Sequence, residues 1–176
     1  MSEILMTRPF GPSIVKTKIP SKILNELNKY VDNTIEDKEK LVKLDHGAQL
    51  AGDVTQEFIL EIEFMKQVGW AEFLGNVAQK YIEMSINKKF STFKIEHSWI
   101  VRQFENEYNP THWHNGHISG VGYLKVPDDL GKPRQKNKST VANGRLQLIH
   151  GSRMFLSNST FNIKPEVGDY ICFQII

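Results

Sequence analysis

Apolar positions in the first half of the chain recur every three or four residues in two separate stretches. This spacing places them on one side of an α-helix, so we expect two amphipathic helices that pack into a core. Ser21, directly after Pro20, is the predicted N-cap of the first helix. The two stripes are Ile23, Leu24, Leu27, Val31 and Ile35, and then Phe73, Leu74, Val77, Ala78, Tyr81 and Ile82.

Two other segments complete the first half. A short extended piece is expected near 14–19, and the polar, glycine-containing segment 41–56 is expected to be a loop. Residues 1–90 are therefore predicted to be a mainly helical front.

Beyond Ser91 the apolar period changes to two, which is typical of β-strands. Many short strands separated by Pro, Gly and Asn turns favour a barrel or jelly roll over a parallel sheet. We therefore predict an α+β fold in a single domain, 1–176, with N-terminal helices packed outside the jelly-roll strands of 91–176. The expected strands cover 91–103, 118–126, 144–150, 160–163 and 169–176.

Composition narrows the class of protein. The chain has 176 residues, of which 40% are hydrophobic and 24% are charged, which is the composition of a folded protein rather than a disordered one. A net charge of +2 gives no reason to expect a nucleic-acid or membrane partner. Cys172 is the single cysteine, so an internal disulfide is excluded. Without a membrane-length apolar run or a signal-peptide pattern, a soluble cytoplasmic protein is expected.

The sharpest chemical feature is the run His112-Trp113-His114-Asn115-Gly116-His117. In extended backbone, residues i and i+2 point the same way, so His112 and His114 can direct two imidazoles at one point. Imidazole is the commonest protein ligand for iron, zinc and copper, and the pair therefore predicts half of a metal site that needs another ligand. The alternative is that these are ordinary histidines hydrogen-bonded to backbone.

Four further residues are candidates for the pocket or for contacts around the metal ligands. Trp113 lies between the two histidines and is a candidate pocket wall, while His117 and His150 are candidates for structural duty or for a third ligand. The four are Trp113, His117, Tyr123 and His150.

The segment around these histidines resembles a known family. Asn109-Pro110-Thr111-His112-Trp113-His114, followed by Ser119-Gly120-Val121-Gly122-Tyr123-Leu124-Lys125-Val126-Pro127, is similar to the iron(II)/2-oxoglutarate-dependent oxygenases of cyanophages and marine bacteria. Gly144-Arg145-Leu146-Gln147-Leu148 and Pro165-Glu166-Val167-Gly168-Asp169 continue the similarity. The resemblance implies a double-stranded β-helix with helices packed outside.

The resemblance also implies a chemistry. His112 would be the first iron ligand, and His114 stands where the family has an acid. The cofactors would be Fe(II) and 2-oxoglutarate, a small-molecule co-substrate whose decarboxylation to succinate is coupled to hydroxylation of a C–H bond.

In the family, a distal histidine ligand and an arginine that pairs with 2-oxoglutarate follow the last strand matched here. No residue of Gln174-Ile175-Ile176 corresponds to either. The resemblance therefore implies a C-terminally truncated oxygenase that would be inactive as given. It also implies an exposed strand edge through which the chain would form a homo-oligomer.

Two alternative functions remain open at this point. One is a non-catalytic, cupin-like or jelly-roll binding module. The other is a metal enzyme that uses three histidines without 2-oxoglutarate, with His117 or His150 completing the set.

Overall fold

The computed structural model describes residues 3–7, 11–133, 135–138 and 141–175. A short 3₁₀ turn at Gly47–Gln49 accompanies the helices and strands. The helices are α1 (Ser21–Glu36), α2 (Lys38–Leu44), α3 (Ile62–Gln67) and α4 (Trp70–Ile86). The strands are β1 (Leu5–Thr7), β2 (Ile14–Lys18), β3 (Gln56–Ile59), β4 (Trp99–Arg102), β5 (Ile118–Gly122), β6 (Leu146–Ile149), β7 (Thr160–Ile163) and β8 (Asp169–Gln174).

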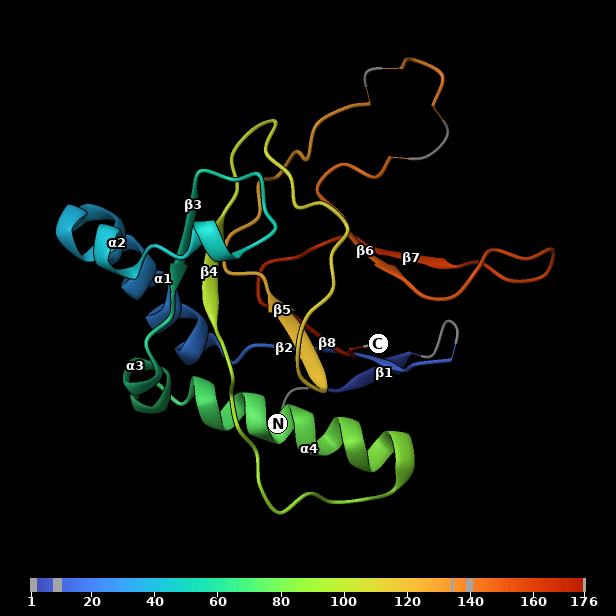
Figure 1. The fold of residues 1–176 in the computed structure, drawn as a ribbon, viewed down its shortest axis with the longest axis horizontal. Coiled ribbons are helices and arrows are strands. Elements are labelled where there is room, and N and C mark those ends of the chain that lie inside the picture. The colour runs from blue at the N-terminus through green and yellow to red at the C-terminus, as the bar shows by residue number, and fades with distance from the viewer. Residues whose placement is uncertain (1–2, 8–10, 134, 139–140, 176) are drawn as a thin grey trace.

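The strands form three separate antiparallel sheets. The main sheet has the order β1-β2-β8-β5, and the other two are the pairs β3-β4 and β6-β7. Figure 1 shows β3 and β4 beside the main sheet, with β6 and β7 projecting from the body. The fold is thus a mixture of helices and antiparallel sheets, as predicted. Instead of the closed jelly roll that we expected, the described residues form three sheets without ladder hydrogen bonds between them.

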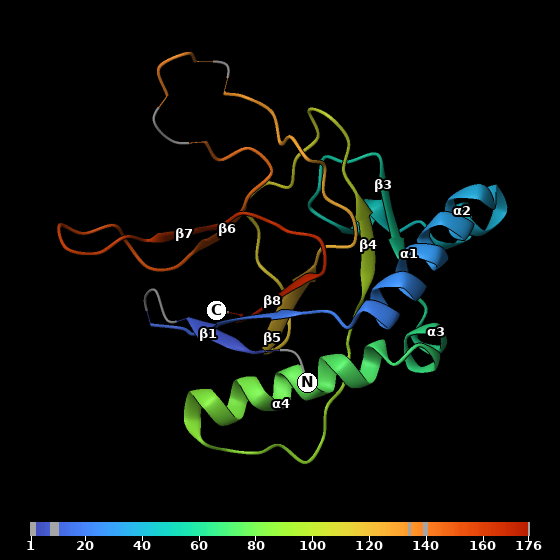
Figure 2. The same cartoon turned by 180° about the vertical axis from the view of Figure 1, so that it is seen from behind.

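Helix α4 covers one face of the main sheet and runs along it, which can also be seen from behind in Figure 2. In an antiparallel pair, residues directly opposite each other share a face. Val15, Cys172 and Gly120 are such partners, and Val15 and Cys172 belong to the core cluster that contains Val77 and Tyr81 of α4. The neighbouring row, Ile14, Phe173 and Ser119, therefore points to the sheet face away from α4.

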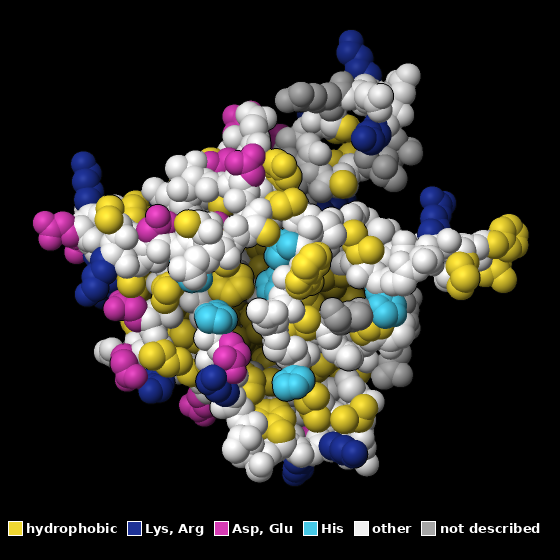
Figure 3. All heavy atoms as spheres, in the orientation of Figure 1, with side chains coloured by type: hydrophobic (Ala, Val, Ile, Leu, Met, Phe, Trp, Pro, Cys, Tyr) yellow, Lys and Arg dark blue, Asp and Glu magenta, His cyan; other side chains and the backbone are white. Residues whose placement is uncertain are grey.

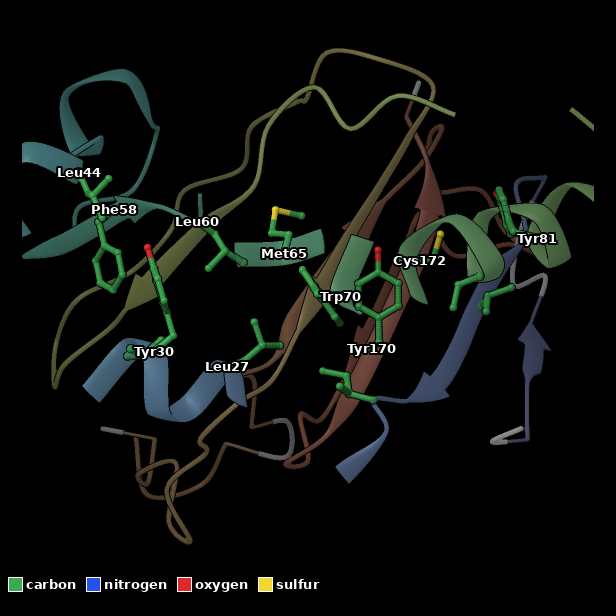
Figure 4. Packing of buried hydrophobic residues seen from close by; sticks show 14 residues of the cluster. Leu27, Tyr30, Leu44, Phe58, Leu60, Met65, Trp70, Tyr81, Tyr170 and Cys172 are labelled. Carbon is green, nitrogen blue, oxygen red and sulfur yellow. The ribbon is translucent and has the colours of Figure 1, made fainter. Parts of the chain in front are cut away.

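The core is continuous from α1 to the main sheet (Figure 4). Trp70 and Phe73 of α4 stack with ring centroids 5.2 Å apart, and both meet the Tyr170 ring edge-on. The labelled core side chains come from helices α1 to α4 and from strands β3 and β8, together with Leu60. Both predicted amphipathic helices therefore pack as expected.

Several local expectations are corrected by the structure. Segment 41–56 holds the end of α2, the 3₁₀ turn and the first residue of β3 rather than loop alone. The strand expected over 91–103 is limited to Trp99–Arg102, because only these residues pair with β3. Ser21 is the first residue of α1 and does not cap it, since Pro20 occupies the N-cap position and no side chain caps the helix.

The remaining strands agree with the expected ones at their centres. Strand β7 covers the predicted residues, while β5 and β6 are shorter than expected. Strand β8 ends at Gln174, and Ile176 of the predicted strand lies outside the described residues. None of the helices in the described part of the chain combines the length and apolar character that crossing a membrane requires.

A buried carboxylate fixes the start of β8. The Asp169 side chain is fully buried, and its two oxygens lie 2.8 Å from Lys16 Nζ and 2.7 Å from Lys18 Nζ. Burial alone would raise the pKa of Asp169, but the hydrogen bonds and charges of the two lysines outweigh it and hold the pKa below its usual value. Gly168, at φ of 82°, forms the turn into the strand, and Glu166 N–H donates to Asp169 Oδ2.

Gly120 of β5 provides space for the Tyr170 ring. A Cβ at this position would lie 2.6 Å from Tyr170 Cζ and 3.0 Å from the backbone oxygen of Ile171. The Tyr170 ring is held by Trp70 and Phe73, so it has little freedom to move aside.

Replacing Gly120 by alanine is expected to lower the free energy of unfolding by about 1–3 kcal/mol, because the added methyl group overpacks a filled core. Urea denaturation measures this change. Gly75→Ala is the control: its Cβ would meet nothing closer than 3.5 Å, and in the interior of α4 alanine should stabilise by about 0.5–1 kcal/mol. Equal stability of the wild type and Gly120→Ala would contradict the prediction.

Asp169→Asn is expected to lower the free energy of unfolding by about 1–3 kcal/mol at neutral pH, because it removes the charge that pairs with two lysines. Since the folded-state pKa of Asp169 is lowered, its contribution is present above the unfolded-state pKa of about 4 and is lost as the pH falls through the folded value. Urea denaturation at neutral pH and at about pH 3 measures the difference, which should shrink in acid.

Asp32→Asn is the matched control for this substitution. The Asp32 carboxylate pairs with Lys125 at 2.7 Å, but both side chains are more than half exposed. A surface pair of this kind is worth about 0–1 kcal/mol. Equal losses in the two variants would show that burial of Asp169 does not matter.

Candidate metal site

The two predicted histidines lie in an irregular segment between β4 and β5. Ser119 of β5, which points to the face away from α4, lies with its Oγ 3.0 Å from His114 Nδ1. The site therefore stands on the sheet face that α4 does not cover. His114 is half-buried, whereas His112 is exposed.

The structure brings the two imidazoles together. The Nε2 atoms of His112 and His114 are 2.9 Å apart, and the rings stack with centroids 4.8 Å apart and an interplanar angle of 25°. This proximity arises in a segment that belongs to no helix or strand, so the two side chains meet without a β-ladder.

Hydrogen bonds orient both rings. His112 Nδ1 lies 2.7 Å from the carbonyl oxygen of Pro110, which only accepts, so this nitrogen carries the proton. In neutral His112, Nε2 then has a free lone pair directed at His114. The Ser119 hydroxyl can donate to His114 Nδ1 or accept from it, so it is compatible with either neutral tautomer of His114.

An aromatic side chain and a groove adjoin the pair. Trp99 of β4 stacks on His114 with ring centroids 5.9 Å apart, and Trp99 also lines a groove of about 340 Å³ together with His46 and Met65. Figure 3 shows histidine side chains around a hollow in which hydrophobic side chains are visible. Trp99 is thus the residue that joins the histidine pair to this groove.

A buried carboxylate from another sheet lies close to this segment. Glu57 of β3 is 3% exposed, and among the residues that the structure describes neither of its carboxylate oxygens has a hydrogen-bond partner. A Cβ on Gly52 would lie 2.7 Å from Glu57 Oε1 and 2.6 Å from Asn109 Oδ1, so both oxygens border the same point. Asn109 precedes His112 by three residues.

The loop that leads into β3 is joined to the histidine segment. Asp53 and Tyr108 form an antiparallel bridge, in which the Asp53 N–H donates to the Tyr108 carbonyl at 2.9 Å. His46 N–H donates to the Glu57 carbonyl at 2.8 Å. These backbone bonds join the loop before β3 both to β3 and to the segment that carries His112.

Burial and neighbouring charges shift two pKa values at the site. Burial lowers the pKa of His114, and the positive charge of protonated His112 lowers it further, so the neutral form that binds metals is favoured. Burial and the negative charge of Asp45 raise the pKa of Glu57, whereas His112 acts in the opposite direction. The charge of His112 therefore lowers the pKa of the Glu57 carboxyl group, against the two larger effects.

The other candidate residues are not gathered at the pair. The Trp113 side chain is 85% exposed, and the ring that stacks on His114 is Trp99 instead. His117 is exposed, and its carbonyl accepts from Ile175 N–H. His150 follows β6, and its ring Nε2 faces Gly11.

Tyr123 lies at the other end of β5 from Ser119. Burial, with a smaller contribution from the charge of Asp169, raises the pKa of Tyr123 to about 12. Tyr123 N–H also donates to the Asp169 carbonyl, which places this residue at the start of β8.

The Nε2 separation within the histidine pair suits either a direct hydrogen bond or two ligand positions at about 90° on an octahedral metal ion. With metal–nitrogen distances of about 2.0–2.1 Å, two neighbouring ligand atoms lie roughly 2.8–3.0 Å apart, and the observed Nε2 separation is 2.9 Å. The Pro110 carbonyl provides the outer contact that fixes a metal-binding tautomer. Within the described ranges, however, no three His, Cys, Asp or Glu side chains form a group that could hold a metal ion as they stand.

Comparison with known proteins agrees with this chemistry. Residues 97–175, which include β4, the histidine segment and β5 to β8, match a family model described as "Putative 2OG-Fe(II) oxygenase". That family in general uses Fe(II) and 2-oxoglutarate, and its fold is a jelly roll. A search of curated proteins and a search of solved structures found no significant match.

Sequence reasoning did not assign Glu57, Ser119 or Trp99 to the site. A glutamate at the start of a strand is ordinarily expected to face solvent, and its burial depends on the loop that closes over it. Trp99 and Ser119 lie close to the histidine motif in the sequence, but their contacts with His114 depend on the positions of β4 and β5 in the fold.

The orientation of His112 gives a direct prediction. Because the Pro110 carbonyl accepts from Nδ1, neutral His112 is expected in the Nδ1–H tautomer in the absence of added metal. Long-range ¹H–¹⁵N correlation spectra of the histidine rings distinguish the two tautomers. His97, which is exposed, serves as the comparison, and an Nε2–H tautomer at His112 would contradict the assignment.

Proposed function

We propose that this chain is an iron(II)/2-oxoglutarate-dependent dioxygenase-like protein of the hydroxylase type, similar to those of cyanophages and marine bacteria, in which His112 and His114 hold the metal. The observation that carries the proposal is the Nε2 separation of 2.9 Å within a segment that matches the oxygenase family. Iron, 2-oxoglutarate and dioxygen would supply the oxidising chemistry: one oxygen atom of O₂ enters the succinate that forms as 2-oxoglutarate loses CO₂, and the other hydroxylates a substrate C–H bond.

The protein's own residues would bind and orient the reactants. The Pro110 carbonyl holds the proton on His112 Nδ1, which leaves Nε2 free to bind the metal. To hold a metal through Nε2, His114 would take the tautomer in which Nδ1–H donates to the Ser119 hydroxyl. Trp99 covers the His114 ring and limits the access of water on that side.

The jelly-roll assignment is part of this proposal. The main sheet, with α4 outside and the histidine pair on its other face, has the arrangement of one wall of such a fold. The groove that contains Trp99 and His46 is the place that we propose for substrate or co-substrate. Its lining is mainly apolar with a few polar groups, which is typical of small-molecule sites.

A second candidate function is a binding module without redox chemistry. It is favoured by one specific observation: the two histidines satisfy each other directly, with His114 Nε2 able to donate to His112 Nε2. In that case the pair is a structural hydrogen bond, and added metal has no effect on it. Metal titration separates the two functions.

Anaerobic titration of the protein with Fe(II), with and without 2-oxoglutarate, is expected to show one bound ion per chain. His112→Ala should abolish this binding, because a single imidazole holds a divalent cation poorly. Isothermal calorimetry measures both proteins, and retention of the wild-type affinity in His112→Ala would overturn the site.

His117→Ala is the control and also tests the three-histidine alternative. His117 is exposed, and its carbonyl accepts from the N–H of Ile175, just after β8, so the substitution keeps this bond and the affinity for Fe(II) should be unchanged. Loss of binding in this variant would replace the proposed site by one that includes His117.

A further inference from the structure

A two-stranded arm projects from the body of the protein and ends in three exposed apolar side chains. The arm, residues 145–164, contains β6, β7 and the connection between them. Met154, Phe155 and Leu156 at its outer end are 69%, 99% and 89% exposed. Figure 3 shows hydrophobic side chains at this outer end, away from the rest of the surface. Single apolar residues are normal on protein surfaces, but three in succession at the end of a projection indicate a contact surface.

Backbone hydrogen bonds hold the end of the arm in a defined turn. The N–H groups of Met154 and Ser157 each donate to the carbonyl oxygen of the other residue, at 3.1 and 3.3 Å. Phe155 and Leu156 are therefore the two central residues of this turn, positions where Gly, Asn, Asp and Ser are ordinarily found. Because small polar residues would form the same turn, neither the turn nor packing within the chain accounts for two large apolar side chains here.

The charge of the chain is distributed unevenly, and the arm lies in its most basic part. Residues 130–165 contain seven of the 22 Lys and Arg residues and none of the 20 Asp and Glu residues, so this segment carries +7 and the rest of the chain −5. The small net charge of +2, which gave no reason to expect a membrane partner, is the sum of these two unequal parts. Figures 1 and 2 show that the described part of the loop before β6 leaves the body on the same side as the arm.

Three cations belong to the arm itself. Arg153 is adjacent to the apolar tip, while Arg145 directly precedes β6 and Lys164 directly follows β7. All three are exposed, and none takes part in the ion pairs among the described residues. Their charges are therefore available to an anion outside the chain.

We propose that the arm binds an anionic lipid surface, in which Met154, Phe155 and Leu156 enter the boundary between headgroups and acyl chains. Arg153 and the other cations of 130–165 contact the headgroups. An apolar surface bordered by cations is the composition of protein elements that lie in a membrane interface. A polybasic segment beside such an anchor strengthens binding to anionic lipids within a Debye length of the surface. The rest of the chain, with its excess of Asp and Glu, stays on the aqueous side.

The apolar tip favours lipid over the other partners that a basic arm attracts. Proteins bind single-stranded nucleic acids through several aromatic rings that stack on successive bases. Met154 and Leu156 have no ring, and Phe155 is the only exposed aromatic residue in the described part of 130–165. In a second copy of the chain, arms that met end to end would bring two segments of +7 together, which opposes pairing.

The test is flotation of the full chain with vesicles of equimolar phosphatidylcholine and phosphatidylserine, and with vesicles of phosphatidylcholine alone. The wild type should bind the mixed vesicles and not the neutral ones, and the affinity should fall as the ionic strength rises. Phe155→Ser combined with Leu156→Ser should weaken binding to the mixed vesicles by at least about tenfold, because it removes side chains that leave water on binding. Arg153→Gln should weaken it by about threefold or more.

Two substitutions outside the arm are the matched controls. Val42 of α2 is 77% exposed, and Lys22 of α1 is an exposed cation. Val42→Ser and Lys22→Gln should leave the vesicle affinity unchanged. Since the tip side chains are exposed, the double serine variant should also unfold at the wild-type temperature, as measured by circular dichroism.

The proposal is overturned if the wild type binds neither kind of vesicle, or if the double serine variant binds the mixed vesicles as tightly as the wild type does. Binding of a single-stranded oligonucleotide in place of vesicles would overturn it in favour of a nucleic acid. A dimer that the double variant loses, in the absence of vesicle binding, would overturn it in favour of a second copy. No metal is present in these measurements, so their result is independent of the proposed oxygenase function.

Discussion

Strand β8 comes late in the chain but occupies the middle of the main sheet, so the rest of the structure depends on how it is inserted. It pairs with β2 from the beginning of the chain and with β5, which directly follows the histidine segment. The buried Asp169 carboxylate fixes the register with β2 through Lys16 and Lys18. A slip of one residue between the two strands would exchange the faces of one of them, turning either Lys16 and Lys18 of β2 or Asp169 of β8 toward α4.

This insertion gives the two faces of the sheet different functions. The face with Val15, Tyr170 and Cys172 packs against α4 and contributes stability, and Gly120 is required there because the Tyr170 ring passes over it. The other face presents Ser119, which orients His114. Strand β5 therefore joins the packed core to the site, because Gly120 packs against Tyr170 and the adjacent residue, Ser119, contacts His114.

The candidate site combines residues that are neighbours in the sequence with residues that come from separate sheets. The histidine pair is local in sequence, and its geometry depends mainly on the Pro110 carbonyl and on the i, i+2 relation. Trp99 and Ser119, which contact His114, come from two different sheets and meet it only through the tertiary structure.

The sequence by itself determined the helices α1 and α4, the centres of the late strands and the histidine pair, because these follow from short-range periodicity and spacing. Three features were decided only by the tertiary structure: the length of β4, the separation of the strands into three sheets, and the burial of Glu57. An apolar alternation such as that over 91–98 indicates only that a strand is compatible with the residues. Whether it forms depends on a partner strand with free backbone groups, and β3 offers these only to Trp99–Arg102. In the same way, a glutamate's chemistry depends on which loops close over it, and that is set by contacts between residues far apart in the chain.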